Sequence, residues 1–188
     1  NGNVSFTGPR ACYDESKRLG ETLCINFYEQ YKIPIKIVRP FNNYGPGLDI
    51  NDRRLIPDIA RNILKDEDVT IFSDGQATRS FCYVSDAAIG YIKALLIGKS
   101  GSPYNIGSDE IEVNVKDLAK QMIKIANNIF NYKGKIEFKK STDKEYLTDN
   151  PSRRCPNLLK AKSELLYSPT IKLNLGLEKS MVWYKENF

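Results

Sequence analysis

Hydrophobic positions along this chain follow two periods, one typical of helices and one typical of short strands. The first apolar face recurs every four residues and consists of Leu19, Leu23, Phe27 and Tyr31. That spacing predicts a helix over residues 13–32, which ends at Ile33–Pro34 because proline disfavours helical backbone at the residue before it. The apolar run of residues 35–38 then predicts a strand.

The same patterns extend over the rest of the sequence. Helices are expected over residues 55–64, 85–97, 158–166 and 175–186, and a further long amphipathic helix is expected to be capped by Asn114. Strands are expected over residues 69–72, 80–84, 103–106 and 135–140. We expect Ser85 and Asp86 to cap the helix that they begin, and residues 141–157 to form a polar loop. Because helices and short strands alternate, the predicted class is α/β.

These elements divide the chain into two parts of one compact unit. Residues 1–48 are expected to complete an open parallel sheet that begins upstream. Residues 49–188 are expected to form mainly a smaller α/β lobe, with some segments returning to the first part. The chain opens without a methionine, in the loop-like sequence of residues 1–3, so we expect it to be a piece of a larger protein.

The composition favours a folded protein over a disordered one. Of the 188 residues, 41% are hydrophobic and 27% are charged, as is ordinary for a globular domain. The net charge of +5 is modest, and without an aromatic stacking platform or a groove-reading motif it indicates no nucleic-acid partner. No apolar run approaches the roughly 18 to 20 residues of a membrane span, so no membrane partner is expected.

Cysteine and histidine usage gives no sign of a metal site. The chain has four scattered cysteines, no C-x-x-C pair and no histidine. Scattered free thiols are typical of a reducing compartment, so we expect a cytoplasmic protein.

Candidate chemistry begins with Tyr13 and Lys17, four residues apart at the start of the first predicted helix. Side chains at this spacing lie on one helix face, so the ammonium can sit near the phenol. A phenol with its ordinary pKa of about 10 is a weak base at neutral pH, and a nearby cation favours its ionised form. The pair can act as a general base, although an ordinary amphipathic helix gives the same spacing by chance.

Three sequence blocks, in order, add weight to this pair. They cover residues 8–18, 75–84 and 150–157, and Arg-Pro-Phe-Asn-Asn-Tyr-Gly-Pro-Gly stands at residues 39–47. The chain thereby resembles, over nearly its whole length, the extended short-chain dehydrogenase/reductase family of NAD-dependent nucleotide-sugar epimerases, dehydratases and decarboxylases. The three blocks are most similar to UDP-glucuronate decarboxylases (UDP-xylose synthases). The resemblance implies that residues 1–48 end a Rossmann-type NAD-binding domain and that residues 49–188 mainly bind a nucleotide sugar.

The resemblance also implies catalytic roles. In the family, the tyrosine matching Tyr13 takes the proton of the sugar 4-hydroxyl while hydride passes to NAD, and the lysine matching Lys17 contacts the nicotinamide ribose. Pro40 and Phe41 are expected to approach the nicotinamide. The resulting 4-keto sugar can lose carbon dioxide, lose water or be reduced again from the other face, which gives decarboxylation, dehydration or epimerisation.

Other matching positions are expected to contact a substrate linked to UDP or dTDP. They are Asn42, Arg54, Arg79, Asn105 and Arg154. Arginine suits such a site because its planar fork makes paired, charge-assisted bonds to phosphate oxygens.

Some of these positions and their neighbours also have a structural interpretation. Asn42 could cap its own loop, and Arg39 is expected to support structure rather than touch ligand. Arg53 and Arg153 each adjoin a better candidate, so one arginine of each pair is expected to be a surface charge.

Part of the family pattern is not found in these 188 residues. The Gly-x-x-Gly-x-x-Gly fingerprint for the NAD pyrophosphate is missing, as is the acidic residue that binds the adenosine ribose. We therefore expect the intact protein to be an enzyme and this fragment to be inactive alone. The resemblance also implies that the intact protein is a homodimer built on its first helix and the preceding one, which would leave the apolar face of the first helix exposed here or covered by a partner. The alternative is a non-catalytic nucleotide-sugar-binding or regulatory protein. Departures at Arg53, Gln76–Ala77 and Asn157 leave decarboxylase, epimerase and dehydratase all open.

Overall fold

The structure is a computed structural model that describes residues 5–140 and 151–188. Its helices are α1 (Ala11–Tyr31), α2 (Leu55–Leu64), α3 (Val84–Ile97), α4 (Val115–Phe130), α5 (Leu159–Leu165) and α6 (Leu173–Asn187). Its strands are β1 (Lys36–Pro40), β2 (Asn43–Tyr44), β3 (Val69–Ile71), β4 (Thr78–Arg79), β5 (Cys82–Tyr83), β6 (Ser102–Ile106), β7 (Val113–Asn114), β8 (Ile136–Phe138) and β9 (Arg153–Arg154). The helices lie within a few residues of their predicted positions, and the α/β class is confirmed.

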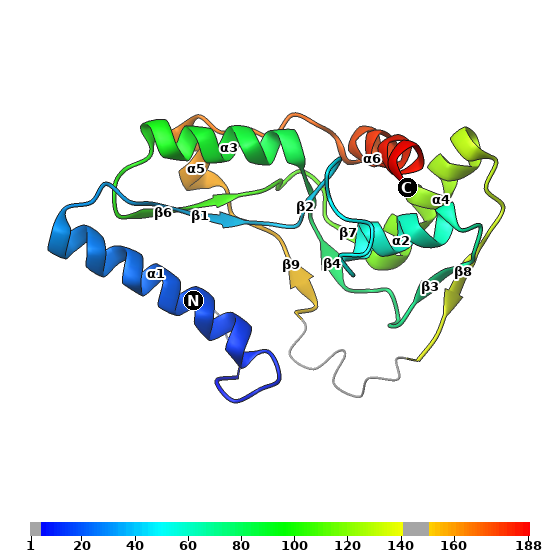
Figure 1. The fold of residues 1–188 in the computed structure, drawn as a ribbon, viewed down its shortest axis with the longest axis horizontal. Helices are drawn as coiled ribbons and strands as arrows, with labels where there is room; N and C mark the ends of the chain where they lie inside the picture. The colour runs from blue at the N-terminus through cyan, green and yellow to red at the C-terminus, as the bar shows by residue number, and fades with distance from the viewer. Residues whose placement is uncertain (1–4, 141–150) are drawn as a thin grey trace.

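One end of the molecule is built on the parallel strand pair β1–β6. Val38 lies opposite Tyr104, and Pro40 lies opposite Ile106. Helix α3 runs along one side of the pair and α1 along the other (Figure 1). Tyr104 and Ile106 are buried in a small core with residues of α3 and α5 and with Tyr167. Segments from the second half of the sequence therefore pack with β1.

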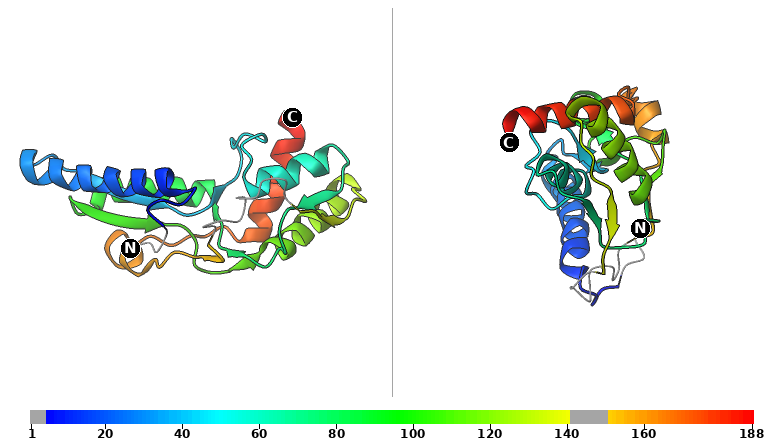
Figure 2. Two further views of the ribbon diagram at one scale, coloured as in Figure 1. Left: turned by 90° about the horizontal axis from the view of Figure 1, so that it is seen from below. Right: turned by 90° about the vertical axis from the view of Figure 1, so that its right-hand side faces the viewer.

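The other end holds the larger core. Helices α2, α4 and α6 pack on one another, and α2 and α4 also pack against β3 of the parallel pair β3–β8 (Figures 1 and 2). The amphipathic pattern of α4 explains this arrangement, because Leu118, Met122 and Ala126 on its apolar face are fully buried. Asn114 caps the helix as expected, accepting a hydrogen bond from the Asp117 amide at 2.7 Å.

A small sheet with the order β7–β4–β9 lies between the two ends (Figure 1). Strand β9 corrects the prediction of a polar loop over residues 141–157, of which residues 141–150 lie outside the described part. Its two arginines pair in parallel with β4, so that Thr78 faces Arg153 and Arg79 faces Arg154. A two-residue strand of charged residues carries no apolar pattern, so its pairing comes from tertiary structure.

Asp86 does not cap α3, contrary to the prediction. The helix begins after Tyr83 without a side-chain cap, and Asp86 lies in its first turn with only 2% of its surface exposed. Its carboxylate accepts hydrogen bonds from the amides of Thr170 and Ile171 at 3.0 and 2.9 Å, and from the Thr170 hydroxyl at 3.0 Å. The buried charge therefore binds the segment between α5 and α6.

Helix α1 has no buried residue. The predicted apolar face is exposed, as its members Leu19, Leu23, Phe27 and Tyr31 show. The Arg39 guanidinium on β1 donates two hydrogen bonds to the Glu21 carboxylate on α1, at 2.6 and 2.5 Å. Near the C-terminal end of α1, the ring of Tyr28 lies against Gly101, where an added Cβ would come within 2.7 Å of the ring. None of the described helices, α1 included, combines the length and apolar content needed to cross a membrane.

Candidate active site

Tyr13 and Lys17 lie together on the first turns of α1. The Lys17 ammonium is 5.1 Å from the centre of the Tyr13 ring, as the four-residue spacing requires. The Tyr13 side chain is 56% exposed. Within residues 5–140 and 151–188, neither the phenol hydroxyl nor the ammonium has a hydrogen-bond partner. Both groups are therefore available to a ligand.

Two arginines predicted to bind diphosphate are brought together by strand pairing. Arg79 on β4 and Arg154 on β9 are register partners although 75 positions separate them in the sequence. Burial, followed by the charges of Arg154 and Arg10, lowers the pKa of Arg79 from its ordinary value. Burial and the charge of Arg10 likewise lower the pKa of Arg154. Converging guanidinium groups that are partly withdrawn from water favour binding of a multivalent anion.

The arginine pair belongs to the same site as Tyr13. Tyr13 and Asp14 both act electrostatically on Arg154, each in the direction that raises its pKa. The Arg154 side chain makes no hydrogen bond or ion pair with any described residue, whereas Arg79 donates to the Thr78 carbonyl at 2.7 Å. The structure thus brings the predicted general base, Tyr13 with Lys17, close to two of the arginines predicted to bind substrate.

Arg10 is a member of this group that the sequence analysis did not single out. Its guanidinium lies 5.5 Å from the centre of the Tyr13 ring, and its Nε is 3.8 Å from a carboxylate oxygen of Asp14. The available signal was its place three residues before Tyr13, within the block of residues 8–18 used for the family resemblance.

The predicted residues after β1 and in β6 lie at the carboxyl ends of these parallel strands, where α/β sheets bind ligands. Pro40 is exposed and ends β1, and the Phe41 amide donates to the Ile106 carbonyl at 2.9 Å. Asn42 adopts a left-handed backbone with φ of 43° and donates from its side chain to the Ser80 carbonyl at 2.7 Å. Asn105 donates to the Asn157 carbonyl at 3.0 Å. Both asparagines make structural hydrogen bonds, and that of Asn42 goes to a segment 38 positions away rather than to its own loop.

Arg54 is the predicted residue for which the structure shows no link to this group. It is exposed and pairs with Asp52, and its charge acts on Tyr184 of α6. Its substrate role stays a prediction. Arg153 and Arg154 differ clearly in their surroundings. Arg153 is exposed and paired with Glu112, whereas Arg154 is half-buried and is the register partner of Arg79.

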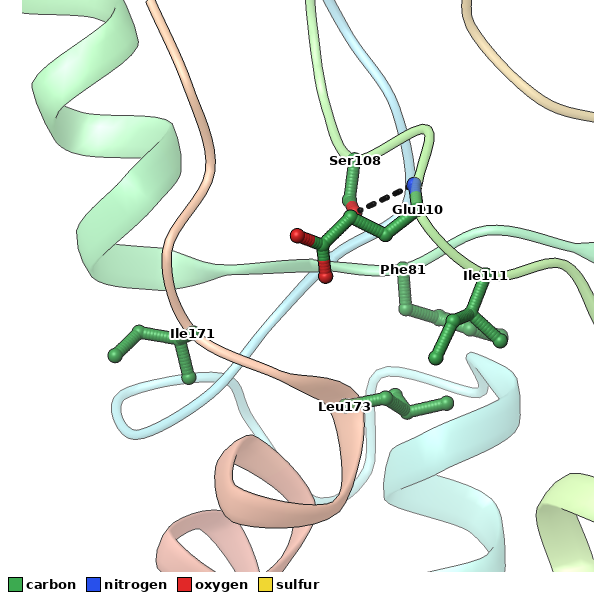
Figure 3. A pocket seen from close by; sticks show the side chains of 6 residues that line it. All are labelled: Phe81, Ser108, Glu110, Ile111, Ile171 and Leu173. Carbon is green, nitrogen blue, oxygen red and sulfur yellow. Dashed lines mark hydrogen bonds between the residues drawn. The ribbon is translucent and has the colours of Figure 1, made fainter.

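A separate hollow of about 250 Å³, which includes open solvent, lies beside α6 (Figure 3). Four of its six lining residues carry apolar side chains, and at its polar side the Glu110 amide donates a hydrogen bond to the Ser108 hydroxyl at 3.5 Å. Its lining residues are Phe81, Ser108, Glu110, Ile111, Ile171 and Leu173. None of the predicted site residues contributes to this hollow, so it is not the candidate active site.

Comparison with known proteins identifies the family. The model of the NAD dependent epimerase/dehydratase family matches residues 2–107. This chain belongs to that family. Family members are NAD-dependent by the family's own description, and the matched range contains Tyr13, Lys17 and Arg79 together with the strand that ends at Pro40.

Individual relatives agree with this assignment. UDP-glucuronic acid decarboxylase 3 of Arabidopsis thaliana is 39% identical over 176 residues, which are 94% of this chain and 48% of that protein. UDP-glucuronic acid decarboxylase 1 of Xenopus tropicalis is 33% identical over 185 residues, 98% of this chain and 41% of that protein. The chain spans about half the length of the curated relatives that it matches.

A solved structure gives the same result for the fold. The UDP-glucuronic acid 4-epimerase of Bacillus cereus, in complex with UDP-glucuronic acid and NAD, has a TM-score of 0.81 and 30% sequence identity. The similarity covers 100% of this chain and 58% of the epimerase chain. The fold is therefore that of the Rossmann-type epimerases and dehydratases.

Proposed function

We propose that this chain supplies the catalytic helix and the nucleotide-sugar site of an NAD-dependent enzyme that oxidises C4 of UDP-glucuronate and then decarboxylates it. The observation that carries the proposal is the convergence of Tyr13 and Lys17 with Arg79 and Arg154. The reaction itself is suggested by relatives named UDP-glucuronic acid decarboxylase.

The residues around Tyr13 fit an NAD nicotinamide and its ribose. The Tyr13 hydroxyl and the Lys17 ammonium are unpartnered within the described part of the chain, and Pro40 is exposed at a strand carboxyl end. Lys17 would bind the ribose hydroxyls, and Pro40 and Phe41 would pack near the nicotinamide ring. Bound NAD would supply reversible hydride transfer.

The protein side of the chemistry is general base catalysis. Tyr13 would accept the proton of the sugar 4-hydroxyl, and the Lys17 ammonium beside the ring would stabilise the phenolate. Arg79 and Arg154 would hold the diphosphate with charge-assisted hydrogen bonds, and Asn42, Asn105 and Arg54 would complete the substrate contacts.

The substituent at C5 would decide the outcome. A carboxylate on C5 makes the 4-keto sugar a β-keto acid, which would lose carbon dioxide as the C5–C6 electron pair moves toward the ketone. A proton would then add at C5, and the hydride taken from C4 would return there to give the UDP-pentose. Without that loss, renewed reduction at C4 from the other face gives epimerisation, and a C6 hydroxyl allows elimination of water. Decarboxylation is the proposal because the relatives' names favour it.

The exposed apolar face of α1 supports a homodimer of the native protein. Leu19, Leu23 and Phe27 form a stripe of large apolar side chains that would be unfavourable in water unless covered. Light scattering of the native protein tests the dimer, and a monomer at micromolar concentration would contradict it.

The four cysteines are free thiols, which supports a reducing, cytoplasmic location.

The test of function is an assay with NAD and either UDP-glucuronate, UDP-glucose or dTDP-glucose, with products separated by mass spectrometry. The protein at its full native length should convert UDP-glucuronate to a UDP-pentose with release of carbon dioxide. The 188-residue chain alone should bind the sugar nucleotide without turnover, because its sequence lacks the Gly-rich NAD fingerprint. Tyr13→Phe should reduce the native rate at least about 100-fold while binding persists.

Each result has a distinct meaning. A UDP-hexose or a dehydrated product would replace decarboxylation by epimerisation or dehydration. Binding without turnover by the native protein would favour the non-catalytic alternative, and unchanged turnover by Tyr13→Phe would remove the assigned base.

A further inference from the structure

Lys17, the cation beside the Tyr13 phenol, has two carboxylates within reach on its own helix. Asp14 stands three positions before it and Glu21 four positions after it, and residues three and four apart are neighbours on a helix surface. A carboxylate paired with Lys17 would offset the positive charge by which the ammonium stabilises the phenolate. The use of Tyr13 as a base therefore depends on where these two carboxylates are held.

Both carboxylates lie against an arginine. Asp14 is 3.8 Å from the Arg10 guanidinium. Glu21 is held from outside the helix, by Arg39 of β1, whose Nε and one terminal nitrogen donate to its two carboxylate oxygens at 2.6 and 2.5 Å. Among residues 5–140 and 151–188, the contact that Lys17 makes is with the Tyr13 ring, and no ion pair joins it to either carboxylate.

The Arg39 fork is well suited to hold Glu21 against competition from Lys17. It makes two parallel bonds to the carboxylate, whereas an ammonium acts as a point charge. The hydrogen bond from Arg39, helped by its charge, lowers the pKa of Glu21 from its ordinary value. Glu21 is therefore ionised at neutral pH, and without Arg39 its charge would be free to turn toward Lys17.

We propose that Arg39 is a positioning residue of the candidate active site, which holds the Glu21 carboxylate away from Lys17 and so leaves the ammonium to the Tyr13 phenol. This inference rests on the proposed function, because it takes the roles of Tyr13 and Lys17 from there. Without Arg39, Glu21 pairs with Lys17 and the phenolate loses part of its stabilisation. Tyr13 then accepts a proton from the sugar only at higher pH.

Other charges that face Tyr13 stay constant in this comparison. The Arg10 guanidinium lies 5.5 Å from the centre of its ring, and Arg154 of β9 interacts electrostatically with both Tyr13 and Asp14. Because none of these groups changes between the variants of Arg39 and Glu21, a difference between variants reports on the carboxylate alone.

The first measurement is the pH dependence of turnover by the native-length protein with NAD and UDP-glucuronate. Arg39→Gln should move the acid limb of the profile upward by about 0.5 to 1 pH unit, and so lower the rate on that limb about 3- to 10-fold, as expected for partial loss of a nearby cation. Glu21→Gln should not move the limb upward, and the double variant Arg39→Gln/Glu21→Gln should restore it. Arg39→Lys keeps a cation opposite Glu21 without the fork and should fall between Arg39→Gln and the unchanged protein.

A second measurement follows the phenol without NAD or turnover. NMR of isotope-labelled tyrosine rings shows the pH at which Tyr13 ionises, and Tyr13→Phe identifies its signal. The variants should have the same order as in the rate profile. Arg18→Gln is the matched control, because it releases the Glu15 carboxylate, 3.6 Å away on the same helix. Glu15 is two positions from Lys17 and does not share its face, so this control should leave the Tyr13 signal and the profile in place.

The outcomes separate a positioning role from a structural one. If the pair only fastens α1 to β1, then Arg39→Gln, Glu21→Gln and the double variant should all lose rate equally, and that result overturns the inference. An acid limb and a Tyr13 signal that Arg39→Gln leaves unmoved overturn it as well. Absence of turnover by the unchanged native protein contradicts the proposed function, whereas the order of the variants in the NMR titration still decides the role of Arg39.

Discussion

Replacing Asp86 with alanine is expected to destabilise the chain more than any single surface change. The carboxylate is 2% exposed and accepts three hydrogen bonds of 2.9 to 3.0 Å from Thr170 and Ile171. Hydrogen bonds to a charged group contribute about 1.5 to 3 kcal/mol each. Thr170 is exposed, so water can replace part of the loss, and we expect a net cost of about 2 to 4 kcal/mol.

Asparagine at the same position separates hydrogen bonding from charge. The Asp86 Oδ2 accepts from both amides and Oδ1 accepts from the Thr170 hydroxyl. In Asp86→Asn the amide oxygen can keep both backbone bonds, and the NH₂ group can donate to the hydroxyl oxygen. Only the charge assistance is lost, so we expect a cost of about 1 kcal/mol.

Thermal and urea unfolding followed by circular dichroism measure both variants. For a chain of this size, the alanine variant should lower Tm by about 4 to 16 °C. Asp109→Asn, which breaks an exposed pair with Lys162, serves as the control and should cost less than about 1 kcal/mol. A loss for Asp86→Ala no larger than for this control would refute the reasoning.

Three further changes test other contacts. Arg154→Ala should weaken UDP binding to this chain about 10-fold or more, whereas Arg153→Ala, which removes an exposed arginine, should leave it unchanged in the same titration. Gly176→Ala should cost about 1 to 3 kcal/mol in urea unfolding despite alanine's higher helix propensity, because the added Cβ would come within 2.1 Å of the Tyr44 hydroxyl. The Arg39 hydrogen bond lowers the pKa of Glu21 from its ordinary 4.5, so the pair stabilises the fold above that pH and the benefit disappears as pH falls through the lowered pKa. Glu21→Gln and the unchanged chain should therefore differ by less than about 1 kcal/mol at neutral pH and converge as the pH falls through the lowered pKa of Glu21; a gap that widens in acid would contradict this sign.

The elements that could be predicted from the sequence are those with their own apolar period. Helix α4 is an example, because its buried face and the Asn114 cap both depend on residues close together in the chain. Strand β9 could not be predicted, since its two arginines pair with β4 across 75 positions of sequence. The role of Asp86 was also wrong at the sequence level, because its partners Thr170 and Ile171 lie 84 and 85 positions away.

The candidate site likewise has one part that could be predicted from local sequence and another that depends on tertiary structure. The Tyr13–Lys17 pair is local and follows from a four-residue spacing on one helix. That Arg154 rather than Arg153 faces Arg79 depends on the register of β9, and no property of the two residue types decides it. Arg10 was overlooked because its relevance comes from what surrounds it in space.

The way α1 is held has a consequence for ligand binding. The helix that carries Tyr13 has no fully buried residue, and its attachments include the exposed Arg39–Glu21 pair and the Tyr28 ring on Gly101. An exposed ion pair contributes at most about 1 kcal/mol, so α1 is less firmly fixed than β4 and β9, which are joined by a register of backbone hydrogen bonds. A ligand that contacts Tyr13 at one end and Arg79 and Arg154 at the other bridges these two parts. Binding of such a ligand would therefore fix α1 against the arginine pair, and the distance between the Tyr13 phenol and the two arginines would depend on the ligand as well as on the fold.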